Sequence, residues 1–162
     1  MSEIRRGTLS SSPGEGESVW FLGDLFEVTL ASEDTGGAFS MVEETSPPQG
    51  GPPPHIHHNE AEALYVLEGE VEVLVGDRTY RAIAGSLAYY HPKGTLHTFK
   101  NIGTSPSKVL FIYSPGGFEK FFLEAGEPAS EGSSPPEGEP DVGRIVEIGR
   151  KYGLQIPPPP GQ

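Results

Sequence analysis

Three side chains that can bind a divalent metal lie within eight positions of one another in the stretch 52–69, PPPHIHHNEAEALYVLEG. His55 and His57 are two residues apart, and alternate side chains of an extended strand share a face, so both imidazoles can reach one ion. Glu62 follows a short turn and opens the next apolar run, where a carboxylate can close the same face. A lone pair of histidines at this spacing is also frequent in surface loops, so this stretch by itself leaves both interpretations open.

A second segment, 85–101, supplies another histidine in a strand-like context after the Pro-x-Gly turn at 92–94. The chain has no cysteine, so any metal must sit on nitrogen and oxygen. The candidate ligands are the imidazoles of His55, His57 and His97 and the carboxylate of Glu62. This set suits Fe, Ni, Mn, Co, Cu or Zn alike, and we expect one such divalent ion per chain. A metal that accepts five or six ligands keeps open positions here, which favours catalysis over a purely structural site.

Together the two segments resemble the paired motifs of the cupin superfamily. In the first, His55-x-His57 is followed by four residues, Glu62, six residues and Gly69. In the second, Pro92-x-Gly94 is followed by two residues, His97, three residues and Asn101. The opening glycines depart slightly: four residues instead of five separate Gly50 from His55, and six instead of five separate Gly85 from Pro92. The resemblance covers roughly residues 19–114 and implies an all-β fold, the cupin double-stranded β-helix or jelly-roll barrel.

Further stretches, 65–70, 92–101 and 110–122, with the Pro-rich tail, resemble the quercetinase-like monocupins. That resemblance implies that His55, His57, Glu62 and His97 bind the metal. It also implies that Glu62 takes the 3-hydroxyl proton of a flavonol before O2 cleaves the heterocycle. A metal-dependent isomerase, or another non-redox enzyme, and a small-molecule-binding cupin without turnover remain alternatives.

The substrate pocket is expected to be apolar. Leu64 and Val66 lie on the face of Glu62 in its strand, and Phe99 lies on the face of His97, so we predict an aromatic or otherwise hydrophobic small-molecule substrate. The basic residues nearby alternate away from the core or sit in turns, which argues against a phosphosugar isomerase. We predict that His58 and His91 are surface or loop residues, that Glu60 is a solvated loop acid, and that Tyr89 and Tyr90 are packing residues.

Composition favours one domain with many short strands. The chain has 162 residues, of which 22 are Gly and 17 are Pro, a content that suits strands joined by turns. The formal net charge of -12 argues against nucleic acid, because a phosphate backbone requires a footprint of Lys and Arg. No apolar run reaches the length of a membrane span, and no signal-peptide core follows the N-terminus, so we expect a cytoplasmic protein that does not contact a membrane.

The pattern of the chain predicts three regions. Residues 1–18 are a flexible polar lead-in, residues 19–117 form the barrel, and residues 118–162 hold short C-terminal helices, a mobile Pro/Glu-rich linker and a Pro-rich tail packed on the barrel. Strands are expected at 19–22, 25–31, 38–44, 63–67, 71–75, 78–83, 87–90, 96–101 and 109–113, and helices at 118–125 and 142–152.

The strand expected at 109–113 is apolar at every position, so both of its faces should be covered. The barrel covers one face, and a helix or a partner chain must cover the other. Together with the amphipathic helices, this surplus of apolar surface predicts a homodimer.

Overall fold

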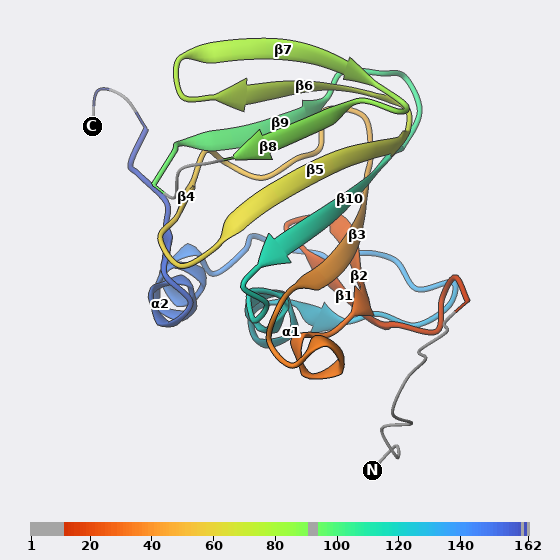
Figure 1. Cartoon of the computed structure of the whole chain (residues 1–162). Helices are drawn as coiled ribbons and strands as arrows, with labels where there is room; N and C mark the ends of the chain where they lie inside the picture. The colour runs from red at the N-terminus through yellow and green to blue at the C-terminus, as the bar shows by residue number, and fades with distance from the viewer. Residues whose placement is uncertain (1–11, 91–93, 160, 162) are drawn as a thin grey trace.

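The computed structural model describes residues 12–90 (backbone only at 89 and 90), 94–159 and 161. Antiparallel strands dominate these residues, as predicted, and two short α-helices accompany them (Figure 1). The strands are β1 (Glu17–Phe21), β2 (Asp24–Leu30), β3 (Ser40–Ser46), β4 (Ile56–His57), β5 (Ala61–Glu68), β6 (Glu70–Val75), β7 (Arg78–Ile83), β8 (Leu87–Tyr90), β9 (His97–Asn101), β10 (Ser107–Ser114), β11 (Glu127–Pro128) and β12 (Leu154–Gln155). The helices are a 3-10 turn, η1 (Ser32–Thr35), and α1 (Glu119–Ala125) and α2 (Val142–Lys151).

The described strands form two main sheets that enclose the core. A seven-stranded sheet has the order β11-β1-β2-β3-β10-β5-β8, and a three-stranded sheet has the order β7-β6-β9. Side chains of period two on both sheets meet between them, because alternate residues of a strand point to the same face. Val42, Leu64 and Val109 on the larger sheet, and Val71 and Val73 on the smaller one, are at most 1% exposed.

Turn residues set the hairpins. Gly76 and Asp77 join β6 to β7 as predicted, with Val75 opposite Arg78 in the register. The turn between β1 and β2 is Leu22-Gly23, one residue earlier than expected, and both residues have positive φ, at 51° and 87°. A two-residue turn with both φ positive matches the right-handed twist of the flanking strands.

Helices α1 and α2 lie together at one end of the sheets (Figure 1). Asp141 begins α2 as predicted, because its Oδ1 accepts a hydrogen bond from the Arg144 backbone N–H at 3.0 Å. After α2, the strand β12 pairs with β4, placing Leu154 opposite His57. The C-terminal segment is therefore attached to the strand that carries one of the candidate ligands. No helix among the described residues is long and apolar enough to cross a membrane.

The prediction of a mobile linker at 127–140 is wrong for its first two residues. Glu127 and Pro128 form β11 and pair with Trp20 and Val19 of β1. The Trp20 indole N–H also donates to Ser133 Oγ at 2.9 Å. The backbone N–H and C=O groups of an edge strand can pair with any extended segment. Such pairing does not depend on side-chain polarity, so the polar composition of the linker could not indicate it.

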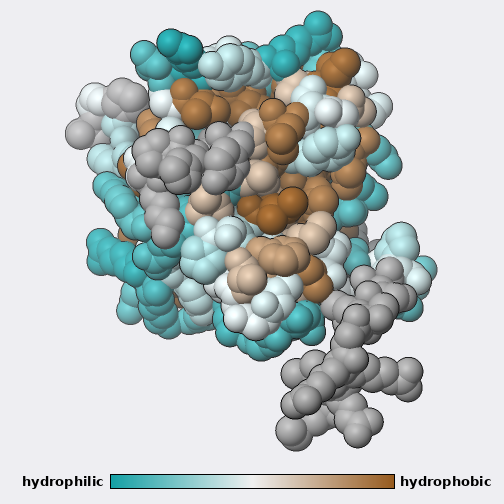
Figure 2. Space-filling model, in the orientation of Figure 1, coloured by the Kyte–Doolittle hydropathy of each residue, from teal (hydrophilic) through white to brown (hydrophobic). Residues whose placement is uncertain are grey.

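Apolar side chains remain on the outer face of the larger sheet. Leu87 of β8 lies opposite Tyr65 of β5, which lies opposite Leu110 of β10, so the three strands carry one continuous row. Leu87 is 66% exposed and Tyr65 is 40% exposed. Figure 2 shows hydrophobic residues gathered over this part of the molecule.

Candidate metal centre

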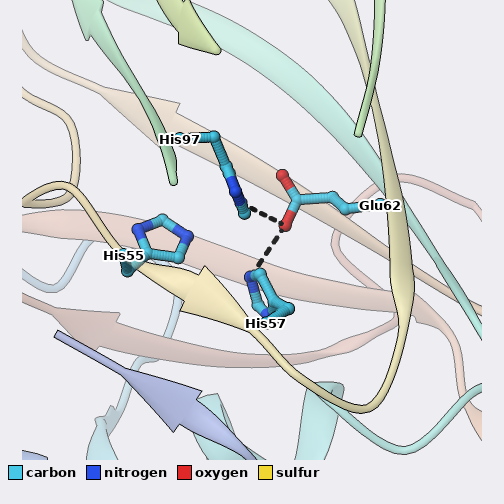
Figure 3. A group of neighbouring side chains, drawn as sticks. All are labelled: His55, His57, Glu62 and His97. Carbon is cyan, nitrogen blue, oxygen red and sulfur yellow. Dashed lines mark ion pairs between the residues drawn. The ribbon is translucent and has the colours of Figure 1, made fainter. Parts of the chain in front are cut away.

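The four candidate ligands converge from three segments of backbone (Figure 3). His57 lies in β4, Glu62 is the second residue of β5 and His97 opens β9. His55 precedes β4 and is bridged to His97 by two backbone hydrogen bonds, of 3.0 and 2.9 Å. One ligand atom from each of the four side chains lies within 4.8 Å of the others. The structure therefore brings together all four of the residues that the sequence indicated.

The loop before β4 positions His55 by running along β9. The Gln49 N–H donates to the Asn101 carbonyl, and the Asn101 N–H donates to the Gly50 carbonyl, each at 2.9 Å. Gly51 has φ 134°, and a Cβ there would overlap the Phe99 carbonyl, so only glycine permits this approach. The buried amide of Asn101 donates to the Ser46 carbonyl at 3.0 Å. The final Asn of the second motif therefore ties the loop to the sheet.

Each histidine uses its Nδ1 to fix the orientation of its ring. Nδ1 lies 2.8 Å from the Pro53 carbonyl in His55 and 2.8 Å from the Thr95 carbonyl in His97. In His57 it lies 2.7 Å from Glu60 Oε1. Because a carbonyl or carboxylate oxygen only accepts, Nδ1–H is the donor, which leaves the lone pair on Nε2.

The Nε2 atoms meet at the carboxylate. Glu62 Oε2 lies 3.0 Å from His57 Nε2 and 3.5 Å from His97 Nε2 (Figure 3). His57, Glu62 and His97 are 2–3% exposed, and His55 is half-buried. The three nitrogens and one oxygen therefore lie close together beside His57, the last residue of β4.

Burial and ion pairing set the charges of these side chains. Burial lowers the pKa of His55 to about 3, and the neighbouring His97 and His57 act in the same direction. Burial also acts to lower the pKa of His57, but its interactions with Glu60 and Glu62 outweigh burial and raise it to about 9. Burial opposes ionisation of Glu62, yet His57 and His97 hold the pKa of that carboxyl well below its usual range. A cation would therefore meet an ionised Glu62 and displace a proton from His57.

The arrangement fits a divalent metal ion. At ligand distances of 2.0–2.2 Å, two donor atoms on one ion lie at most about 4.4 Å apart, so the group has to contract by only a few tenths of an ångström. The Nε2 of His57 is buried and lies 3.0 Å from Glu62 Oε2, so loss of its proton would leave two donor atoms aimed at one ion. A His3Glu group can therefore hold a metal here.

A small cavity of about 50 Å³ adjoins the donor group. His55, Glu62 and His97 form one part of its wall. The rest of the wall is mostly aromatic and apolar: Phe21, Leu22, Phe26, Pro52, Pro53, Phe99, Phe111, Tyr113, Phe118, Phe121, Phe122, Leu154 and Ile156, with Glu44 and Thr98 as the polar members.

The pocket residues named from the sequence fall into two groups. Phe99 lines the cavity, whereas Leu64 and Val66 are buried in the core and do not line it. Phe111 lies opposite Leu64 in the register, and its larger ring reaches the cavity instead. The spacing of Phe118, Phe121 and Phe122 at i, i+3 and i+4 predicts that their rings pack in the core and do not form a ligand surface. The three side chains are at most 6% exposed, as the prediction requires, and they also line the cavity. They are therefore both core residues and part of the cavity wall.

Sequence reasoning missed two sets of buried acids. Glu60, expected to be a solvated loop acid, is 6% exposed and contacts His57. The sequence feature that could have indicated this contact is the i, i+3 spacing of His57 and Glu60 across a turn. Glu44 is 1% exposed, and burial, followed by its hydrogen bond with Asp24, raises its pKa well above the usual value. Its signal was the period of two that places Glu44 on the face of Val42. His58 is exposed, as expected, while the predictions for His91 and for the side chains of Tyr89 and Tyr90 lie outside the described residues.

Comparison with known proteins supports the resemblance drawn from the two motifs. Residues 42–113 match the family model of the cupin domain. Quercetin 2,3-dioxygenase of Bacillus subtilis (strain 168) is 26% identical over 115 residues, which cover 71% of this chain and 34% of that protein. A probable germin-like protein, subfamily 2 member 5, of Arabidopsis thaliana is 39% identical over 70 residues, covering 41% of this chain and 33% of that protein. The matched part thus spans about a third of the length of these curated relatives.

Solved structures show the same fold at low sequence identity. A predicted oxalate decarboxylase from Thermotoga maritima aligns with a TM-score of 0.61 and 18% identity, over 66% of this chain and 99% of that one. An RmlC-like cupin from Shewanella frigidimarina NCIMB 400 aligns with a TM-score of 0.57 and 16% identity, over 70% of this chain and 96% of that one. The predicted β-barrel fold class is confirmed, and at this identity the likeness shows the fold alone.

Proposed function

Because residues 42–113 form a cupin domain, we propose that this protein is a metal-dependent dioxygenase that cleaves a flavonol-like or other enolic aromatic substrate with O2. The observation that carries the proposal is the position of the His3Glu group, which forms one part of a cavity with an otherwise mostly aromatic wall. Aromatic rings favour a planar ligand, and a metal-binding end favours a ligand with an oxygen donor such as an enol. The similarity to a quercetin 2,3-dioxygenase agrees with this choice.

The side chains of His55, His57, Glu62 and His97 would hold the metal. A divalent transition metal would supply Lewis acidity to the bound oxygen donor and, where redox-active, electron exchange with O2. Glu62 would accept the proton of an enolic hydroxyl, a role supported by the position of its carboxylate on the cavity wall beside two imidazoles. Phe111, Tyr113 and Phe118 exclude water from this transfer, since their rings form the adjoining wall.

The size of the cavity limits the substrate. A pocket of about 50 Å³ is smaller than the roughly 150 Å³ apolar cavity that accommodates benzene. A three-ring flavonol therefore requires the wall to move, whereas a single planar ring requires a smaller movement. The C-terminal segment that carries Leu154 and Ile156 would be the part of the wall that moves, since β12 is joined to β4 through only two residue pairs.

A phosphosugar isomerase has less support. A phosphate group requires Lys, Arg or a cluster of backbone N–H groups, and the described lining contains neither Lys nor Arg. A non-redox enzyme or a binding protein without turnover remains the alternative outcome of the experiment.

The test measures metal content and oxygen consumption together. Protein purified without a histidine tag is analysed for metal, then assayed for O2 uptake with quercetin and with 3-hydroxypyran-4-one, which is the flavonol heterocycle alone. Glu62→Gln keeps an oxygen near the metal but loses the proton acceptor, so turnover should fall by roughly 10²- to 10⁴-fold with a smaller loss of metal. His57→Ala removes a nitrogen ligand and should lower metal occupancy itself, with activity following occupancy.

Two results would count against the proposal. Full oxygen uptake by Glu62→Gln at full metal content would show that Glu62 is not the base. A wild-type protein that holds redox-active metal and consumes no oxygen with either substrate would move the function to the non-redox or binding alternatives.

A further inference from the structure

The three histidines of the metal centre are not equivalent. His55 and His97 donate their Nδ1–H to backbone carbonyls, whereas His57 donates to a carboxylate, Glu60 Oε1, at 2.7 Å. We propose that Glu60 is a positioning residue that acts through His57: it selects the ring orientation that aims Nε2 at the metal and adds a second negative charge to the centre. The inference rests on the metal-binding part of the proposed function and is independent of the dioxygenase chemistry.

The aromatic rings around His57 fix the plane of its imidazole, but they do not determine which edge of the imidazole points toward the candidate metal site. The ring of His97 stacks on it at 5.1 Å and 20°, and the ring of Phe118 meets it edge to face at 4.3 Å and 81°. A rotation of 180° about the Cβ–Cγ bond keeps the ring in this slot but exchanges its nitrogen and carbon positions. The contacts with flat aromatic faces change little on that rotation, since they depend on shape. Two polar contacts distinguish the orientations: the 2.7 Å hydrogen bond of Nδ1 to Glu60 Oε1, and the 3.0 Å contact of Nε2 with Glu62 Oε2, which is itself a candidate metal ligand. Glu60 is the member of this pair that lies outside the donor group.

The backbone that leads into the turn of Glu60 is held at its start. The His58 N–H donates to the Gly153 carbonyl at 2.9 Å, and the His57 carbonyl accepts from the Gly94 N–H at 3.0 Å. Both bonds hold the peptide between His57 and His58, where β4 ends and the short turn to β5 begins. Glu60 is 6% exposed and His57 is 3% exposed, so their hydrogen bond is shielded from competing water.

The charge of Glu60 matters because the centre is buried. A divalent ion bound by three neutral imidazoles and Glu62 carries a formal charge of +1, and burying a net charge in an apolar setting is costly. The carboxylate of Glu60, in contact with His57, brings the formal total to zero. A second carboxylate in this place therefore favours a divalent cation and strengthens His57 as its donor.

Two variants separate orientation from charge. Glu60→Gln is nearly isosteric and its amide oxygen still accepts from Nδ1–H, so it removes the charge alone. Glu60→Leu removes both the charge and the acceptor. The control is Glu68→Gln, because Glu68 is an exposed acid at the far end of β5 from Glu62. The dissociation constant for Co(II) is measured by competition with a chelator, and the visible spectrum of the bound Co(II) reports its ligand number and geometry.

We expect Glu60→Gln to weaken Co(II) binding by about 10-fold with an unchanged spectrum, and Glu60→Leu to weaken it by up to about 100-fold with an altered spectrum. Glu68→Gln should bind as the wild type does. Wild-type affinity and spectrum in Glu60→Gln and Glu60→Leu would overturn the inference while leaving the metal site intact. If Glu60→Leu does not fold, Glu60→Gln decides the question: a loss of affinity at an unchanged melting temperature supports the inference, and unchanged affinity overturns it. A wild-type protein that takes up no Co(II) overturns the proposed function together with this inference.

Discussion

Phe118 joins the hydrophobic core to the metal centre, so its truncation should affect both. The ring is 4% exposed and packs against His57 at 4.3 Å, Tyr113 at 5.0 Å, Phe121 at 5.2 Å and Phe122 at 5.3 Å between ring centroids. Phe118→Ala removes these contacts and leaves a space that rigid strands on one side cannot close. Buried Phe-to-Ala changes cost about 3–5 kcal/mol, which is a large part of the roughly 5–15 kcal/mol free energy of unfolding of a typical domain.

Thermal and chemical denaturation measure this loss directly. For a chain of this size about 1 kcal/mol corresponds to roughly 2–4 °C, so the melting temperature of Phe118→Ala should fall by about 6–20 °C. The matched control is Phe39→Ala, since Phe39 is 37% exposed and outside the core cluster; it should change the free energy of unfolding by less than about 1 kcal/mol.

The same truncation enlarges the cavity beside the ligands. Starting from about 50 Å³, the added space of the missing ring should admit a benzene-sized ligand, and binding would raise the melting temperature of Phe118→Ala but not that of the wild type. A loss below about 1 kcal/mol together with no effect of such a ligand would refute the reasoning, because it would mean that the wall collapses or that the ring does not fill this site.

Two more predictions concern the buried acids and the outer face of the sheet. Burial and the hydrogen bond with Asp24 raise the pKa of Glu44 well above its usual 4.5, so the native state holds a proton that the unfolded chain releases above that pH. The free energy of unfolding should therefore fall as the pH rises above 4.5 towards the raised pKa of Glu44. Glu44→Gln should flatten this slope in denaturant titrations, and equal slopes for both proteins would contradict the buried acid. The outer-face row formed by the exposed Leu87 and Tyr65 and the partly buried Leu110 is suited to a second copy of the chain. Light scattering at micromolar concentration should therefore give twice the chain mass, and a mass of 17.3 kDa would contradict the homodimer.

The candidate metal centre was predictable because most of its geometry is local in the sequence. Alternation along a strand places His55 and His57 on one side, and a short turn returns the chain to Glu62. The position of His97 followed from the recurrence of a second motif at a compatible spacing. The hairpin at Gly76-Asp77 and the start of α2 at Asp141 were likewise visible, since turn and cap preferences act over two to four residues.

The walls of the site depended on segments far away in the sequence. Leu154 and Ile156 reach the cavity from nearly a hundred residues beyond His57, and the pairing of β12 with β4 that brings them there has no local signal. Phe111 rather than Leu64 reaches the cavity, although both lie on inward faces. Which of two inward side chains lines a space depends on how the sheets close, and periodicity alone does not determine that.

Glu60 shows the same difference between local sequence signals and contacts made by distant segments. It follows the polar residues His58 and Asn59, and a carboxylate in a short turn is usually solvated. The C-terminal residues that bond His58 and extend the sheet beside His57 turn that loop into part of the interior. The sequence by itself therefore determined the donor set, because ligand type and strand period are local properties. Only the tertiary structure decided which acid supports the donors and which rings enclose them, because burial depends on the distant segments that cover a residue.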